Sequence, residues 1–195
     1  MSLRLFAGIA FAFAASSALG QPMHHQGAMS AAARQAAIRE ALTAAPAAIA
    51  GHARVTDMEG HVLREGNNGY TCMPSPVGTP VGRHAPMCVD EIWLAAMQAY
   101  AHHDASYRPP RVGIAYMLAG DTGTSNINPY DEHRTRDNQW VEEGPHLMVI
   151  EPDPARLRGV STDPNNGGPY VMWPGTPYAH LMIPVGPRPA RSARR

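Results

Sequence analysis

Three short apolar segments between residues 144 and 185 constrain the fold of this chain most strongly. Prolines, glycines and asparagines separate the three segments, which cover residues 146–150, 170–173 and 179–185. Short apolar segments bounded by such turn residues are typical of strands. The tripeptide His-Leu-Met begins at His146 and again at His180. Because side chains two residues apart on a strand share a face, each tripeptide is predicted to present one imidazole and one thioether together.

Two other stretches have the spacing of helices. Ser30 is suited to cap a helix that runs to about Ala45, and the apolar face of residues 89–104 predicts a second helix. Further strands are predicted at residues 53–57, 61–65, 70–73 and 111–118, with loops at residues 74–87 and 121–144. Since helices and strands do not alternate regularly, the sequence predicts an α+β fold with a mainly antiparallel sheet and two helices.

Residues 1–20 have the pattern of a secretory signal peptide. Arg4 supplies a positive start, residues 5–15 are apolar but too short to span a bilayer, and small residues before the end suit cleavage after Gly20. The mature chain of about 175 residues has the size of one domain. We expect a flexible leader at 21–29, a single domain at 30–186 and a disordered basic tail at 187–195. The protein is thus predicted to be periplasmic or secreted, with no transmembrane segment once the signal is removed.

The composition excludes several classes of function. The sixteen basic residues are all arginine, which excludes a phosphate-binding lysine and a lysine Schiff base. The formal net charge is zero, and a neutral domain without a basic stripe argues against a nucleic-acid partner. The sequence motifs of common serine hydrolases, zinc proteases and dithiol redox proteins are absent.

Four sequence blocks carry a resemblance. They are Asn-Gly-Tyr-Thr-Cys-Met-Pro at 68–74, Pro-Met-Cys-Val-Asp-Glu at 86–91, Gly-Ile-Ala-Tyr-Met-Leu at 113–118, and residues 167–185. The blocks are similar to those of a group of exported bacterial proteins of unknown function. The resemblance spans roughly residues 45–185 and implies a single exported domain. Because it implies no activity, the functional hypotheses rest on residue chemistry.

Cys72 and Cys88 are the only cysteines of the chain. In an oxidising compartment an isolated pair predicts a disulfide. The alternative is a copper(I) site in which the two sulfurs act together with the thioethers of Met73 and Met87, since all four are soft ligands. Neighbouring side chains on a strand point to opposite faces, so the disulfide is the preferred prediction.

The two His-Leu-Met tripeptides form the main candidate site. The predicted metal ligands are His146, Met148, His180 and Met182, a set whose imidazoles and thioethers suit copper. The same imidazoles could line a pocket for a small polar or anionic ligand, together with Tyr116, Tyr170, Trp173 and Tyr178. In the structural alternative the methionines fill the core and each histidine has a backbone partner.

The long loop offers weaker candidates. Asp121-Thr122-Gly123 resembles the aspartic-protease motif, in which two aspartates share a proton. The motif does not recur, Gly120 replaces a large apolar residue, and the chain is too short for two lobes, so we predict that Asp121 has no protease role.

Acidic residues of the same loop could hold a hard cation or could simply be solvated; they are Asp131, Glu132, Asp137, Glu142 and Glu143, with His133 between them. Met23, His24 and His25 are interpreted as part of the flexible leader rather than as a copper site.

The sequence therefore predicts an exported, soluble binding module for a small ligand or for copper. The first alternative is an envelope enzyme, hydrolytic in kind, that uses His146 or His180 as general base with an aspartate of residues 121–137. The second is a structural or interaction protein without a small-molecule site. Burial of both imidazoles without a cavity favours this last alternative, whereas a cleft shared with an aspartate favours the enzyme.

Overall fold

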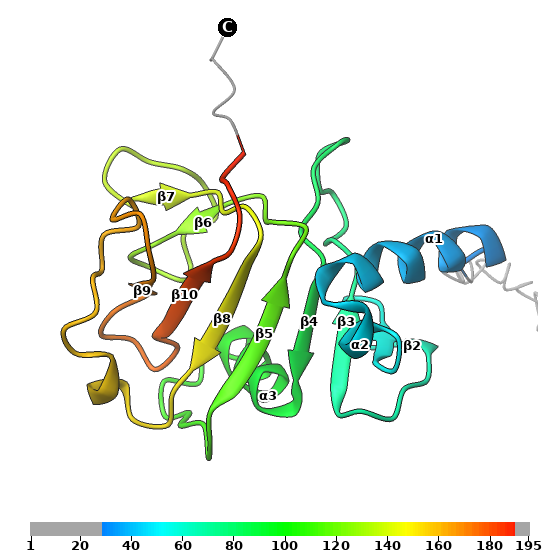
Figure 1. The fold of residues 1–195 in the computed structure, drawn as a ribbon, viewed down its shortest axis with the longest axis horizontal. Coiled ribbons are helices and arrows are strands. Elements are labelled where there is room, and N and C mark those ends of the chain that lie inside the picture. The colour runs from blue at the N-terminus through cyan, green and yellow to red at the C-terminus, as the bar shows by residue number, and fades with distance from the viewer. Residues whose placement is uncertain (1–28, 190–195) are drawn as a thin grey trace, which may run out of the picture.

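An eight-stranded sheet forms the centre of the fold. The structure is a computed structural model that describes residues 29–189, so the predicted signal peptide and nearly all of the leader lie outside it (Figure 1). The strands follow the order β2-β1-β3-β4-β5-β8-β10-β9. Within the described range β1 and β3 run parallel, and the other pairs of this sheet are antiparallel. The predicted α+β fold with a mainly antiparallel sheet is confirmed.

The N-terminal half supplies one end of the sheet. Its strands are β1 (Arg54–Thr56), β2 (Val62–Arg64), β3 (Tyr70–Met73) and β4 (Met87–Asp90). Strands β1 and β2 form the hairpin predicted from the alternating pattern. Cys72 of β3 lies directly opposite Cys88 of β4, and a disulfide joins them. The predicted disulfide is confirmed, and neither sulfur is free to bind copper.

The helices lie on both faces of this sheet; they are α1 (Ala31–Ala41), α2 (Ala47–Ala50) and α3 (Glu91–Ala101). The Ser30 hydroxyl caps α1 as predicted, by accepting a hydrogen bond from the Ala33 amide. The predicted start of the second helix at residue 89 is wrong, because residues 87–90 pair with both β3 and β5. Asp90 ends β4 and caps α3 through the Trp93 amide, at 2.8 Å.

The C-terminal half adds the strands β5 (Gly113–Met117), β8 (His146–Ile150), β10 (His180–Pro184) and β9 (Tyr170–Met172). A second, two-stranded sheet consists of β6 (Thr124–Ser125) and β7 (Trp140–Val141). It lies within residues 121–144, which were predicted as a loop.

Helix α3 covers one face of β5, β8 and β10. This face presents Ala115, Met148 and Met182 in one row, and all three are buried in the same cluster as Ile92 of α3. Gly113 permits the close approach of the helix, because a Cβ atom at this position would lie 2.9 Å from the Ile92 side chain. Helices α1 and α2 cover the opposite face around the disulfide. Within residues 29–189, no helix has both the length and the apolar character that a membrane span requires.

Candidate functional site

The register of β8 against β10 decides how the predicted metal ligands are placed. Met148 lies directly opposite Met182, and the two histidines lie at opposite ends of this pair. All four side chains share one face, as the spacing predicts, but His146 and His180 are offset by four residues, about 13 Å along the strands. The antiparallel register thus gives each imidazole its own surroundings.

Both imidazoles are buried, with His146 0% and His180 1% exposed. The Nδ1 atom of His146 donates to the Gly144 carbonyl at 2.7 Å, and that of His180 donates to the Tyr178 carbonyl at 2.9 Å. In each neutral ring Nε2 therefore carries a lone pair, and neither Nε2 atom has a hydrogen-bond partner among residues 29–189. Burial lowers the pKa of both rings, that of His180 to about 4. Complete burial suits a structural role, yet the two lone pairs stay unused.

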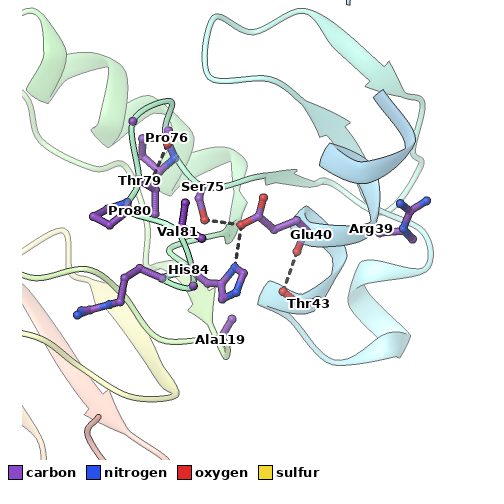
Figure 2. Close-up of a pocket in the computed structure, with 13 residues that line it drawn as sticks. Arg39, Glu40, Thr43, Ser75, Pro76, Thr79, Pro80, Val81, His84 and Ala119 are labelled. Atoms are coloured by element: carbon purple, nitrogen blue, oxygen red, sulfur yellow. Dashed lines mark hydrogen bonds and ion pairs between the residues drawn. The ribbon is translucent and has the colours of Figure 1, made fainter. Parts of the chain in front are cut away.

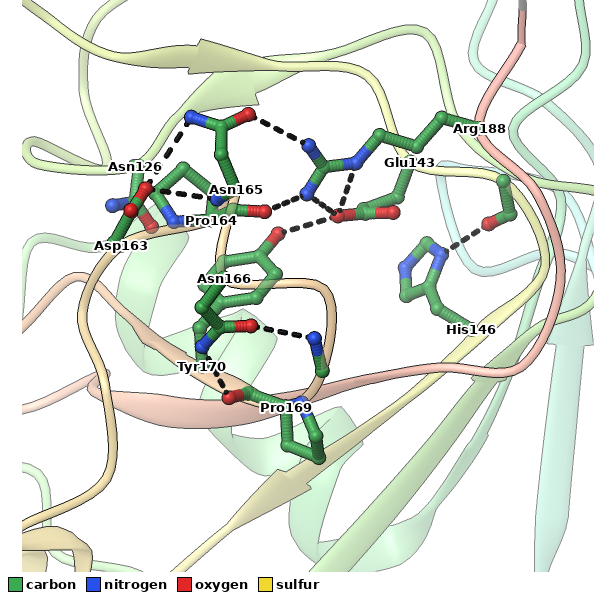
Figure 3. Close-up of polar contacts among 12 residues, drawn as sticks. Asn126, Glu143, His146, Asp163, Pro164, Asn165, Asn166, Pro169, Tyr170 and Arg188 are labelled. Atoms are coloured by element: carbon green, nitrogen blue, oxygen red, sulfur yellow. Dashed lines mark hydrogen bonds and ion pairs between the residues drawn. The ribbon is translucent and has the colours of Figure 1, made fainter.

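The two rings contact different side chains. The His180 ring lies edge-on to two indoles, with centroids 5.1 Å from Trp93 and 5.0 Å from Trp173. The unpaired edge of His146 faces Glu143 and Tyr170 instead (Figure 3). The six predicted ligand-binding residues therefore do not share one pocket, and Tyr116 lies on the opposite face of the sheet beside Tyr70.

A buried polar centre surrounds Glu143, whose side chain is fully buried. One carboxylate oxygen accepts hydrogen bonds from the Tyr170 hydroxyl at 3.0 Å and from the Arg188 guanidinium at 2.9 Å (Figure 3). The other oxygen is buried without a partner. Arg188 also donates to the Pro164 carbonyl and to the Asn165 side chain. Arg188 belongs to the segment predicted as a basic tail, and these contacts hold its side chain against a buried carboxylate.

Asp121 anchors the long loop beside this centre. One of its oxygens accepts from the Gly123 amide at 3.0 Å and from the Glu143 amide at 2.8 Å. The pKa of Asp121 is raised to about 7, mainly by burial and also by the charges of Glu143 and Glu142. The two hydrogen bonds lower the pKa but do not offset the effect of burial. The Asp-Thr-Gly residues at 121–123 thus form a turn, and Asp121 links this turn by a hydrogen bond to the segment that precedes β8.

The other acidic residues of the loop do not form one cluster. Glu142 pairs with Arg83 at 2.7 Å. Among residues 29–189, one group of three histidine or acidic side chains brings its ligand atoms within 4.8 Å of one another: Asp57, Glu59 and His61, in the β1–β2 turn. The group is largely exposed, and its members were not singled out in the sequence.

A cleft of about 690 Å³ separates α1 from the β3–β4 loop (Figure 2). Ser75 donates to Glu40 at 2.6 Å, and Nδ1 of His84 lies 3.1 Å from the same oxygen. In a catalytic triad the histidine stands between the serine and the acid. Here the carboxylate stands between them, so the imidazole cannot take the Ser75 proton, and the contacts instead tie the loop to the helix.

A second cleft, of about 410 Å³, lies between the end of α3 and the long loop. Tyr100, His103 and Tyr130 contribute to its lining. Tyr130 stacks on Tyr100 with ring centroids 5.3 Å apart, and His103 stacks on Tyr130 at 4.1 Å. On its other side Tyr100 stacks on Trp173 at 5.7 Å. Four nearly parallel rings therefore run from Trp173 to the exposed His103.

Three of the predicted ligand residues lie at the base of this stack, where Tyr178 and His180 are buried and Trp173 is half-buried. They are Trp173, Tyr178 and His180, and Tyr178 lies perpendicular to both Tyr100 and Tyr130. Tyr100 lies within residues 89–104, whose apolar face predicted a helix, and Tyr130 was not among the predicted site residues. The sequence signal that could have indicated this pair was an aromatic residue near the end of a predicted helix, Tyr100, and another in a long polar loop, Tyr130.

The backbone is strained around the same cleft. Within the described range, the non-glycine residues with positive φ are His103 at 55°, Gln139 at 45° and Trp173 at 55°. His103 lines the cleft, Gln139 precedes the lining residue Trp140, and Trp173 belongs to the stack. Such conformations cost on the order of 1 kcal/mol each and are concentrated at functional sites.

Comparison of the chain with models of known protein families, with curated proteins and with solved structures finds no match.

Replacing Arg188 should expose how strongly the C-terminal segment depends on Glu143. Arg188→Ala leaves a buried carboxylate without its cation, and the free energy of unfolding should fall by roughly 2–3 kcal/mol in urea titrations. In a Glu143→Gln background the same replacement should cost much less, because the amide still accepts from Tyr170 and carries no charge. Equal losses in the two backgrounds would show that the ion pair is unimportant.

The low pKa of His180 predicts an acid-dependent loss of stability. The unfolded chain binds a proton near pH 6.5, whereas the folded chain resists protonation down to about pH 4. Stability is therefore full above pH 6.5, and wild type should lose roughly 3 kcal/mol relative to His180→Leu as the pH falls to about 4.

Urea titrations of both proteins at each pH measure this difference. Asp121 has the opposite effect, because its folded carboxyl keeps a proton up to about pH 7, but this contribution cancels in the comparison. Replacement of the exposed His52 by leucine is the control. A constant difference between wild type and His180→Leu across this pH range would contradict the assignment.

Proposed function

We propose that this protein is an exported binding module whose cleft beside Tyr100, Tyr130 and Trp140 holds a small ligand. The observation that carries the proposal is the parallel ring stack that walls the cleft. The strained backbone at His103 and Trp173 supports it, because such conformations persist only where surrounding contacts impose them. Export is supported by the signal pattern and the disulfide.

The charges of the lining favour a ligand that carries a positive charge. Asp131 and Glu132 line the cleft and no arginine does. Burial raises the pKa of the Tyr100 hydroxyl, and the charge of Glu132 raises it further, which indicates a carboxylate beside the ring stack. The stacked rings cover the faces of Tyr100 and Tyr130, so the attraction for an ammonium group comes from the two carboxylates and from Trp140, the further aromatic ring of the lining. A small organic cation therefore fits the cleft better than an anion does.

Choline and its uncharged isostere dimethylbutanol test this chemistry. Calorimetry and tryptophan fluorescence measure the affinity of wild type for each compound. Wild type should bind choline, and it should bind dimethylbutanol at least about tenfold more weakly. Glu132→Gln and Tyr130→Ala should each weaken choline binding by a similar factor. The matched control is Tyr70→Ala, since Tyr70 belongs to a tyrosine pair elsewhere on the sheet. Equal binding of choline and dimethylbutanol, or an equal loss in the control, would refute the cationic site.

A copper-binding function is the second candidate, and it rests on the two unpartnered Nε2 atoms. His146 shares a sheet face with Met148, and His180 shares it with Met182. Each neutral imidazole and nearby thioether is a donor pair that suits copper(I). The enzyme alternative has less support, because neither of the two clefts is lined by His146 or His180.

Copper(I) titration against a coloured chelator distinguishes this candidate. Wild type should compete for the ion, His146→Ala and His180→Ala should each bind less, and the double variant should bind least. The control His52→Ala removes an exposed imidazole and should behave as wild type does. If the double variant retains wild-type binding, the copper function is excluded.

A further inference from the structure

The aromatic rings that line the cleft of Tyr100 and Tyr130 differ in how far a ligand can reach their faces. Tyr100 is stacked between Tyr130 and Trp173. Tyr130 in turn is stacked between Tyr100 and His103. Trp140 also lines the cleft, and it makes no ring–ring contact within the part of the chain that the structure describes. A ligand in the cleft can therefore contact this indole, whereas the faces of the two tyrosines are covered.

A glycine makes room for the indole. Gly123 directly precedes β6, which pairs with β7, the strand that Trp140 begins (Figure 1). The φ of Gly123 is +97°, and a Cβ atom there would lie 2.2 Å from Nε1 and 3.0 Å from Cε2 of Trp140. The Cγ atom of Glu142, at 2.7 Å, belongs to a flexible side chain that can move aside, but the rigid indole cannot bend. A methyl group at position 123 would therefore push the ring out of its place.

Asp121 fixes this glycine against the segment that carries the indole. Its carboxylate accepts from the Gly123 amide at 3.0 Å and from the Glu143 amide at 2.8 Å. Glu143 lies two residues after the end of β7. The hydrogen bonds of one side chain thus join the start of the long loop to its end. The Asp-Thr-Gly turn, which has the letters of a protease motif, consequently determines where Trp140 lies at the cleft.

An accessible indole beside carboxylates favours one kind of ammonium group. A primary ammonium is strongly hydrated and donates hydrogen bonds in several directions, so it needs several acceptors when it leaves water. The indole provides no acceptor, and the lining carboxylate of Asp131 already accepts from the Asn128 side chain at 2.7 Å. A quaternary ammonium donates no hydrogen bond, and an aromatic face attracts its charge. The lining therefore suits a quaternary ammonium better than a primary one.

We propose that the cleft selects a quaternary ammonium ligand over a primary one through Trp140, which the Asp-Thr-Gly turn at 121–123 positions. The proposal rests on the ligand site proposed above, and it adds the class of cation and the means of selecting it. Trp140 is the residue that contacts the ligand. Gly123 is a positioning residue, because it acts only by leaving the space that the indole occupies.

Choline and ethanolamine test the proposal, because the two cations differ only in the methyl groups on nitrogen. In calorimetry at neutral pH, wild type should bind choline at least about tenfold more tightly than ethanolamine. Trp140→Ala should bind the two compounds alike, and Trp140→Phe, which keeps a ring, should retain part of the preference. Gly123→Ala should lose the preference as Trp140→Ala does, because the displaced indole no longer contacts the ligand.

Two controls separate positioning from a general effect on the fold. Gly159 has φ +87°, and a Cβ atom there would meet nothing within 4 Å. Gly159→Ala therefore brings similar backbone strain without displacing a ring, and it should keep the wild-type preference. In the Trp140→Ala background, Gly123→Ala should lower the choline affinity no further, since no indole remains to be moved. Urea unfolding curves of every variant establish that the protein under test is folded.

The possible failures can be told apart. If wild type binds choline and ethanolamine equally, selection by Trp140 is wrong while the ligand site itself stands. If wild type binds neither compound, the ligand site and the selection both fall. The positioning role is refuted if Gly123→Ala keeps the preference, or if it weakens choline binding by the same factor with and without Trp140.

Discussion

The antiparallel pairing of β5, β8 and β10 beneath α3 is the constraint on which the rest of the structure depends. It aligns Ala115, Met148 and Met182 in one buried row and brings α3 against a glycine. A register shift of one residue would turn every side chain of a strand to the other face. The two histidines therefore enter the core because the methionines do, and their burial follows from the strand period rather than from any preference of imidazole for apolar surroundings.

The same register explains why two copies of one tripeptide have different chemistry. His180 lies between two indoles, and its ring is edge-on to both and donates to the Tyr178 carbonyl. His146 faces the carboxylate of Glu143. Arg188 pairs with one oxygen of this carboxylate, and the other oxygen has no partner among the described residues. The second oxygen of Glu143 and the Nε2 lone pair of His146 are both hydrogen-bond acceptors without a partner among the described residues, so the two atoms cannot satisfy each other.

Local signals account for what the sequence predicted correctly. The Ser30 cap, the 53–65 hairpin and the C-terminal strands each rest on residues within a few positions of one another. The disulfide needed only an isolated cysteine pair in a chain predicted to be exported. The errors have non-local causes. Residues 87–90 are a strand because β3 and β5 pair with them. The ring stack joins Tyr100, Tyr130 and Trp173, whose positions in the sequence give no sign of contact. Register, which separates the two imidazoles, has no signature in either strand alone.

An ion pair connects the β3–β4 loop, residues 74–86, with the segment beside the aromatic cleft, and the strength of this pair limits how far loop and cleft can influence each other. Arg83 of the loop pairs with Glu142, which follows β7 and the lining residue Trp140. Both side chains are about a third exposed, and pairs of this kind contribute on the order of 0.5 kcal/mol. The loop is held mainly by the disulfide and by Glu40, neither of which touches the cleft. Free energies at sites that share so little contact add independently. A substitution in residues 74–86 is therefore expected to leave the ligand affinity of the cleft unchanged.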